Sequence, residues 1–261
     1  MLDQVSRITA EAGRIALERS AGEYRRWEKV PGHPVCEVDL EVDAFLRERL
    51  SALDPDAGWL SEETLDASDR IERPRVWVVD PIDGTRDYLR GRPGWCVSVA
   101  LVEDRVPVLG VLDAPMRGEH WTARRSGGAW RNGRRLEASG RTRFIGARVP
   151  ADSLPKADGD LVAVSKPNSI ALRIAMVAAG EADLVATLRW GFEWDIAAAA
   201  LIASEAGATV AGALGQPLAF NTASGEAFGV LVSAPGIHAE AAERLRARAF
   251  RRTTSRPQTR T

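Results

Sequence analysis

The sequence VWVVDPIDGTRDY, residues 76–88, places two aspartates directly after a short apolar run. The run VWVV predicts a buried strand, and Pro81 bends the chain so that Asp80 and Asp83 can turn toward one point instead of toward opposite faces. Carboxylate oxygens beside backbone carbonyls suit a hard divalent cation such as Mg²⁺. Because no lysine stands beside the pair, its charge is left for a metal to neutralise. The stretch therefore predicts a strand that ends at a metal site.

The turn that follows, Gly84 and Thr85, adds two backbone N–H groups in a tight bend. Such a bend suits a phosphate held beside a metal. The alternative is a surface turn in which Asp80 or Asp83 caps the next helix. A phosphatase of the haloacid dehalogenase type is excluded, because its Asp-x-Asp-Gly-Thr motif would place the nucleophilic aspartate at Pro81.

Two further acidic clusters lie elsewhere in the chain. GWLSEET, residues 58–64, places Glu62 and Glu63 after a short apolar stretch, and FEWDIAAAALIASEAGA, residues 192–208, places Asp195 at the start of an alanine-rich helix. Taken singly, the glutamates are typical of solvated surface acids and Asp195 is typical of a helix N-cap. Together with the aspartates of the first stretch, they favour a metal site over a simple surface turn.

The composition is that of an ordinary water-soluble globular protein. The 261 residues are 45% apolar and 27% charged, and the net charge is -1, which argues against a nucleic-acid polymer or a membrane surface as partner. Cys36 and Cys96 are too few for a disulfide framework, the N-terminus lacks the apolar core of a signal peptide, and no segment approaches the roughly 20 apolar residues that span a bilayer. We expect a cytoplasmic protein without membrane anchoring, monomeric or homodimeric, whose partner is a small molecule.

The order of predicted elements divides the chain into two lobes. Apolar side chains at helical spacing predict helices over 5–20 and 39–53, and the runs VWVV, WCVSVALV, VPVLGVL and EHWTAR predict a sheet built on hairpins. Residues 1–145 are therefore expected to form an α+β lobe. Strand and helix patterns then alternate, which predicts an α/β lobe over 146–250. The basic, Thr-rich tail 251–261 is expected to be disordered.

Taken together and in this order, LSEET, DPIDGTRDY and WDIAAAALIASEAGA resemble the lithium-sensitive, Mg²⁺-dependent phosphatase superfamily of inositol monophosphatase, fructose-1,6-bisphosphatase and 3'-phosphoadenosine 5'-phosphate phosphatase. The resemblance covers nearly the whole chain. It implies a layered αβαβα sandwich of the sugar-phosphatase type, with the site between the two lobes. It also implies two or three Mg²⁺ ions, a small phosphate ester as substrate, and inhibition by Li⁺.

The resemblance assigns roles to particular residues. It implies a water held on metal, with Glu62 and the pair Asp39 and Thr85 helping to remove its proton. The backbone N–H groups of Gly84 and Thr85 would hold the phosphate. The implied metal ligands are Glu62, Asp80, the backbone carbonyl of Ile82, Asp83 and Asp195; the implied substrate-binding residues are Asp83, Gly84, Thr85 and Asp195.

Smaller features distinguish the branches of the superfamily. Inositol monophosphatases usually have a glutamate seven residues before the last metal aspartate, and that position here is Leu188. EKVPGHPVCEVD resembles the nucleotidase pattern K-x-D-x-S-P-V-T-x-A-D at Lys29, Pro34, Val35 and Asp39, with Pro31, His33 and Cys36 in place of its Asp, Ser and Thr. LGQPLAFN resembles that branch's G-K-P-L-x-Y-N. These features favour a 3'(2'),5'-bisphosphate nucleotidase of sulfur metabolism that converts 3'-phosphoadenosine 5'-phosphate to AMP and phosphate.

Two alternative functions stay open at this stage. One is an inositol-1-monophosphatase or another sugar or polyol phosphatase. The other, of a different class, is a catalytically inactive protein that binds a phosphate ligand. Within the nucleotidase reading, Arg189 or Trp190 could stack on the adenine, whereas a buried Trp190 would simply fill the core.

Overall fold

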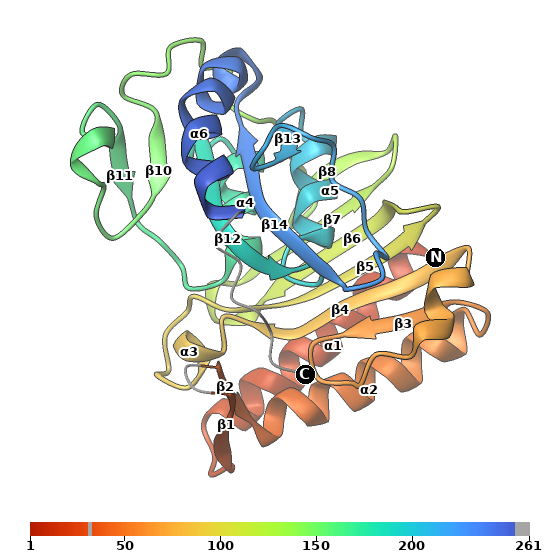
Figure 1. Ribbon diagram of the computed structural model, residues 1–261. Coiled ribbons are helices and arrows are strands. Elements are labelled where there is room, and N and C mark those ends of the chain that lie inside the picture. The colour runs from red at the N-terminus through yellow and green to blue at the C-terminus, as the bar shows by residue number, and fades with distance from the viewer. Residues whose placement is uncertain (31–32, 254–261) are drawn as a thin grey trace.

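The computed structural model describes residues 1–30 and 33–253. A seven-stranded sheet forms the centre of the first half (Figure 1). Its first two strands are parallel, and all other neighbours are antiparallel. In order across the sheet, the strands are β3 (Gly58–Ser61), β4 (Arg75–Asp83), β5 (Cys96–Glu103), β6 (Val106–Ala114), β7 (Glu119–Arg124), β8 (Gly128–Arg131) and β9 (Arg134–Arg135).

Helices cover both faces of this sheet. α1 (Leu2–Ser20) and α2 (Glu37–Leu53) pack on one face, while α4 (Ile170–Ala178) and α5 (Ala197–Glu205) lie on the other (Figure 1). The two helices expected in the first lobe are confirmed, and each begins a few residues earlier than the apolar pattern indicated.

β4 shows why a short apolar run can hold the molecule together. Trp77 and Val79 enter the core formed with α1 and α2, while Val76 and Val78 enter the core formed with α4 and α5. Successive side chains of a strand point to opposite faces, so a strand covered on both faces is apolar at every position. The strand is longer than VWVV, because it continues to Asp83.

A second, three-stranded sheet belongs to the later half of the chain. Its strands lie in the order β12 (Leu184–Phe192), β14 (Glu226–Ser233), β13 (Thr209–Gly212), and both pairings are antiparallel. One face joins the core of α4 and α5, and the other packs against α6 (His238–Thr253). The order of layers is helices, large sheet, helices, small sheet, helix, which confirms the αβαβα sandwich (Figure 1).

Shorter elements complete the fold. β1 (Arg26–Val30) and β2 (His33–Cys36) form a separate antiparallel pair between α1 and α2. β10 (Arg148–Pro150) and β11 (Val162–Val164) form a separate parallel pair. α3 (Thr85–Tyr88) is a single turn that directly follows β4.

The C-terminal helix extends beyond the predicted end of the second lobe at residue 250. The expected start of the tail at residue 251 is too early, because α6 continues to Thr253, and Arg248 anchors its last turns through a 2.9 Å ion pair with Asp158. Residues 254–261 lie outside the described residues, so their disorder stays a prediction. The division between 145 and 146 also stays a prediction, since one core cluster contains residues from both halves.

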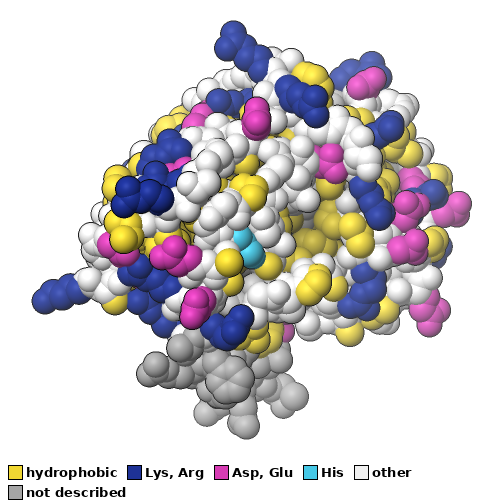
Figure 2. Space-filling view, turned by 90° about the horizontal axis from the view of Figure 1, so that it is seen from above, with side chains coloured by type: hydrophobic (Ala, Val, Ile, Leu, Met, Phe, Trp, Pro, Cys, Tyr) yellow, Lys and Arg dark blue, Asp and Glu magenta, His cyan; other side chains and the backbone are white. Residues whose placement is uncertain are grey.

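The surface and the helices agree with the near-neutral composition. On the face shown in Figure 2, positive and negative side chains are interspersed instead of separated into patches of one sign. Among the helices of the described residues, none is both long enough and apolar enough to cross a bilayer.

Candidate active site

The end of β4 carries a bulge that turns two carboxylates to the same side. Asp80 pairs with Ser98 and Asp83 with Cys96, so the stretch between the pairs is one residue longer on β4 than on β5. A bulge of this kind breaks the alternation of a strand and redirects its side chains. Asp80 is 1% exposed, and its Oδ1 accepts the backbone N–H of Ile82 at 3.0 Å. The bend predicted at the proline is therefore present.

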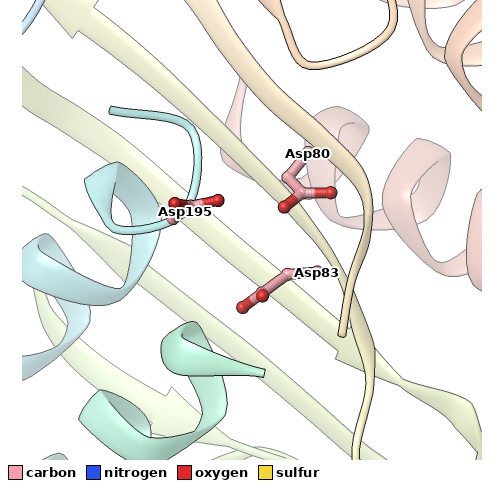
Figure 3. Close-up of side chains that lie close together, drawn as sticks. All are labelled: Asp80, Asp83 and Asp195. Atoms are coloured by element: carbon pink, nitrogen blue, oxygen red, sulfur yellow. The ribbon is translucent and has the colours of Figure 1, made fainter. Parts of the chain in front are cut away.

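Asp195 approaches these two carboxylates from the other side of the site. One carboxylate oxygen from each of Asp80, Asp83 and Asp195 lies within 4.8 Å of the others (Figure 3). Asp195 precedes α5 and does not cap it, because the N-cap residue is Ile196. Its Oδ2 accepts the backbone N–H of Phe192 at 3.1 Å. The three acids predicted from separate motifs thus converge.

The N-terminus of α4 fixes Asp83. Oδ2 of Asp83 accepts the hydroxyl of Ser169 at 2.5 Å and the backbone N–H of Ala171 at 2.8 Å. Ser169 is also the N-cap of α4 and accepts the N–H of Leu172 at 2.9 Å. A helix N-terminus favours a negative charge, so this contact holds the carboxylate in one orientation. Ser169 is absent from the predicted site, although a serine before the apolar run IALRIAMV is a recognisable cap signal.

Glu62 lines the same cavity, beside the three aspartates. The loop that carries Glu62 is held by the buried carboxylate of Asp43, which accepts hydrogen bonds from the hydroxyls of Ser61 and Thr64. Nζ of Lys29 donates to the backbone carbonyl of Glu62 at 3.1 Å and forms a 2.6 Å ion pair with Glu63. It lies 3.8 Å from Oε1 of Glu62. The side chain of Glu62 thus lines the cavity, whereas that of Glu63 forms an ion pair with Lys29.

Asp39 and Thr85 meet as the resemblance implied. The Thr85 hydroxyl lies 3.3 Å from Oδ1 of Asp39 and 3.0 Å from the backbone carbonyl of Ile82. It has one proton, so it can donate to only one of them at a time. Oδ2 of Asp39 accepts the backbone N–H of Cys36 at 2.8 Å and the thiol at 2.9 Å. Burial raises the pKa of Cys36 to about 12, so the thiol keeps its proton and takes over the donor role of a threonine hydroxyl.

The carboxylates of the cavity resist ionisation. Burial raises the pKa of Asp80 well above its usual value, and the charges of Glu62, Asp83 and Asp195 raise it further. Burial, with a neighbouring acid, raises the pKa of Asp195 to about 7 and that of Glu62 to about 8. Clustered acids of this kind are stabilised in their charged form by an adjacent cation. The donor set, with oxygen atoms only, therefore fits Mg²⁺.

The turn after the bulge admits only glycine. Gly84 has φ of +100°, and a Cβ there would lie 2.7 Å from the carbonyl oxygen of Gly94 and 3.0 Å from the amide nitrogen of Ser169. Both the backbone conformation and the close approach exclude a side chain. The turn and the first residue of α3, Thr85, thus present backbone to the cavity, where the first amides of a helix have no partner within the helix.

Comparison with known proteins identifies the family. The family model described as the inositol monophosphatase family matches residues 2–253. The chain belongs to this family. Members are Mg²⁺-dependent phosphatases, and the chain is a phosphomonoesterase of this type.

Individual relatives carry different names. Over 235 residues the chain is 33% identical to an inositol-1-monophosphatase of Mesorhizobium japonicum, covering 80% of this chain and 84% of that protein. Over 236 residues it is 32% identical to the 3'(2'),5'-bisphosphate nucleotidase CysQ of Aggregatibacter actinomycetemcomitans, covering 79% and 86%. The solved structure of an IMPase from Thermotoga maritima matches with a TM-score of 0.83 at 26% identity, over 96% of this chain and 98% of that chain.

In this inositol monophosphatase family protein, the cavity above the acids has a volume of about 420 Å³. Its lining also includes Arg189, Trp190 and Phe192 from the end of β12. Trp190 is half-buried and packs against Phe228 with ring centroids 5.4 Å apart. It therefore both fills space and faces the cavity, which combines the two readings of this residue.

A buried polar network positions the segment that carries Asp195. Glu193 is 0% exposed, and its carboxylate accepts the N–H groups of Asn221, at 2.5 Å, and Thr222, at 2.9 Å. Asn221 in turn accepts a hydrogen bond from the buried guanidinium of Arg70 at 2.5 Å. The asparagine of LGQPLAFN thus ties the two sides of the site together. The motif marked this residue, but Arg70 and Glu193 were not predicted.

Proposed function

We propose that this phosphatase removes the 3'-phosphate of 3'-phosphoadenosine 5'-phosphate and releases AMP and phosphate. The observation that carries the proposal is the lining of the cavity, which combines three converging carboxylates with an arginine and two aromatic side chains from the end of β12. The acids suit the metal-dependent cleavage of a phosphate ester. The arginine and the aromatic side chains suit a second anionic group and a base.

The side chains of Glu62, Asp80, Asp83 and Asp195 and the backbone carbonyl of Ile82 are proposed to hold Mg²⁺. Magnesium, when bound, neutralises phosphate oxygens and lowers the pKa of water. Because Asp80 and Asp83 come from one lobe and Asp195 from the other, the two sides of the cavity are brought together at the phosphate.

Asp39 and Thr85 are proposed to handle the proton of the attacking water, together with Glu62. A proton passed to the Thr85 oxygen can move on to Oδ1 of Asp39, 3.3 Å away, which is a geometry suited to general base catalysis. When the Thr85 hydroxyl points to Asp39, the Ile82 carbonyl is released from it. The backbone N–H groups of Gly84 and Thr85 are proposed to hold the phosphate with Asp83 and Asp195.

The residues available to the leaving group argue against a polyol. A ring of hydroxyl groups needs hydrogen-bond acceptors, but the position where inositol monophosphatases usually have a glutamate is Leu188, and its side chain lines a different cavity. Glu193, the glutamate nearest in the sequence, is fully buried and already bound to Asn221 and Thr222. Inositol 1-phosphate is the second candidate, since one of the relatives named above is an inositol-1-monophosphatase.

Phosphate release under saturating Mg²⁺ tests the proposal. The chain is incubated in parallel with 3'-phosphoadenosine 5'-phosphate, inositol 1-phosphate and fructose 1,6-bisphosphate. We expect kcat/KM to be at least about tenfold higher for the nucleotide, which corresponds to about 1.4 kcal/mol in the transition state. A higher value for inositol 1-phosphate overturns the assignment, and no release from any ester supports a binding protein instead.

A further inference from the structure

The active-site end of β12 departs from regular strand geometry at Leu188 and Arg189. Thr187 pairs with Val230 and Trp190 with Phe228, so these two residues lie opposite one residue of β14, Gly229. The extra residue is a bulge, which re-aims side chains. Leu188 lines the cavity beside α6, whereas Arg189 lines the active-site cavity.

Gly229 makes this bulge possible. Its φ is +60°, and a Cβ on it would lie 2.2 Å from the carbonyl oxygen of Thr187 and 2.7 Å from Cβ of Ala213. No side chain fits at either distance, so the two strands approach closely only because the residue is glycine. The direction of Arg189 is thus built into the backbone of both strands.

The guanidinium of Arg189 is not held in place by a hydrogen bond or an ion pair with any described residue. Within the described ranges, 1–30 and 33–253, it makes no side-chain hydrogen bond and no ion pair, and the residue is exposed. The second arginine nearby, Arg173 of α4, is half-buried and donates to the backbone carbonyls of Pro167 and Asn168. Burial lowers the pKa of Arg173, and the charge of Arg189 lowers it further. The two cations therefore lie near each other, close to the acids of the cavity: the charge of Asp83 raises the pKa of Arg173, and the charge of Arg189 lowers that of Asp195.

We propose that Arg189 is a specificity-determining residue that binds a second phosphate of the substrate. This inference rests on the proposed function, because it assigns the 5'-phosphate of the nucleotide to Arg189. Arginine binds phosphate through two parallel N–H groups, and Arg189 lines the cavity without a hydrogen bond or ion pair to a described residue that would compete for them. Substrates with a single phosphate leave this arginine unused.

A pair of nucleotides that differ in one phosphate tests the inference. We compare kcat/KM for 3'-phosphoadenosine 5'-phosphate and for 3'-AMP, which lacks the 5'-phosphate, in the natural chain and in Arg189→Ala, Arg189→Lys and Arg246→Ala. The last variant removes an exposed arginine of α6 as a control. The natural chain is expected to prefer the bisphosphate by about tenfold to a hundredfold, the range of a charged hydrogen bond.

Arg189→Ala is expected to bring this ratio close to one, mainly through KM, and Arg189→Lys to restore part of it. If Arg189→Ala slows both nucleotides by the same factor, Arg189 binds the scissile phosphate and the inference is wrong. It is also wrong if the ratio is the same in all four proteins. Calorimetry gives a readout without turnover, since AMP should bind more tightly than adenosine and lose that advantage in Arg189→Ala.

The same design separates the two proposals. If the natural chain cleaves only inositol phosphates, the proposed nucleotide function fails. Inositol 1,4-bisphosphate and inositol 1-phosphate then replace the nucleotide pair in the four proteins. A bisphosphate preference that Arg189→Ala removes still supports the arginine site, and equal rates for the two esters overturn it.

Discussion

The two walls of the active-site cavity are built in opposite ways. On the acid wall, Asp83 accepts hydrogen bonds from Ser169 and Ala171, and Asp39 accepts two from Cys36. On the wall formed by the end of β12, the side chain of Arg189 has no hydrogen-bond partner among the described residues. We therefore propose that the chemistry of the phosphatase depends on a packed network, whereas its choice of substrate depends on side chains that can change without disturbing the fold.

The largest effect is expected from Asp83→Asn on the acid wall. The substitution removes one charge from the metal-binding set and leaves the shape of the side chain, so turnover should fall about a thousandfold or more while the fold persists. Phosphate release and circular dichroism measure the two properties. Asp104→Asn, in an exposed turn with φ of 48°, is the control and should keep full activity. Near-normal turnover of Asp83→Asn contradicts the assignment.

Magnesium should also change how the stability of the protein depends on pH, because the clustered acids of the cavity titrate differently in the folded and unfolded chain. In EDTA, Glu62 and Asp195 have pKa values raised to about 8 and about 7, so the folded chain holds protons that the unfolded chain has lost. The free energy of unfolding should fall as pH rises from about 5 to 8.

Adding Mg²⁺ at a hundred times its dissociation constant should restore about 2.7 kcal/mol at the upper end of this range. Thermal unfolding followed with EDTA and with Mg²⁺ at each pH measures both effects. A melting temperature that is constant over pH 5 to 8 in EDTA, or that ignores Mg²⁺, argues against a cation-dependent acid cluster.

Glu193→Gln tests the network behind Asp195. The amide keeps one acceptor oxygen and places its NH2 against the N–H of either Asn221 or Thr222, which leaves buried donors unpaired at a cost of about 2 kcal/mol. The Mg²⁺ concentration needed for half-maximal activity should rise as well. Chemical denaturation gives the first number and a magnesium titration the second. Glu243→Gln, on the exposed side of α6, should change neither, and an equal effect of both variants would remove the special role of Glu193.

The smallest of these effects is expected from Ser169→Ala. Loss of an N-cap costs about 1 kcal/mol, and Asp83 keeps the N–H of Ala171, so activity should fall only about tenfold. Ser126→Ala, in an exposed turn, provides the matched comparison. A loss as large as that of Asp83→Asn would show that Ser169 itself takes part in the reaction.

The grouping of the acids could be predicted only from three motifs taken together, because each acidic cluster alone is typical of surface acids or of a helix cap. Asp80, Asp83 and Asp195 were each assigned from their motifs and converge as expected. Ser169 and Arg70 escaped prediction since their partners are distant in sequence: Ser169 binds a residue 86 positions away, and Arg70 one 151 positions away. Contacts of that kind follow from the packing of layers and leave no local pattern.

The direction of the side chains at the end of β12 could not be predicted from the sequence. The sequence drew attention to Leu188 and Arg189, but it could not tell which of them faces the substrate. That choice depends on a bulge whose cause is Gly229, on another strand. A shift of one residue exchanges the two faces of a strand, so the specificity of the cavity was beyond the reach of motif comparison alone.

The site proposed above requires that acids from distant segments of the chain gather around magnesium. A crystal structure of the chain grown with Mn²⁺ in place of Mg²⁺ tests it most directly, because the anomalous signal locates the metal. The account predicts peaks within bonding distance of carboxylate oxygens of Asp80, Asp83 and Asp195, and their loss in Asp83→Asn. Metal bound elsewhere, or no metal at these acids at millimolar Mn²⁺, would contradict it.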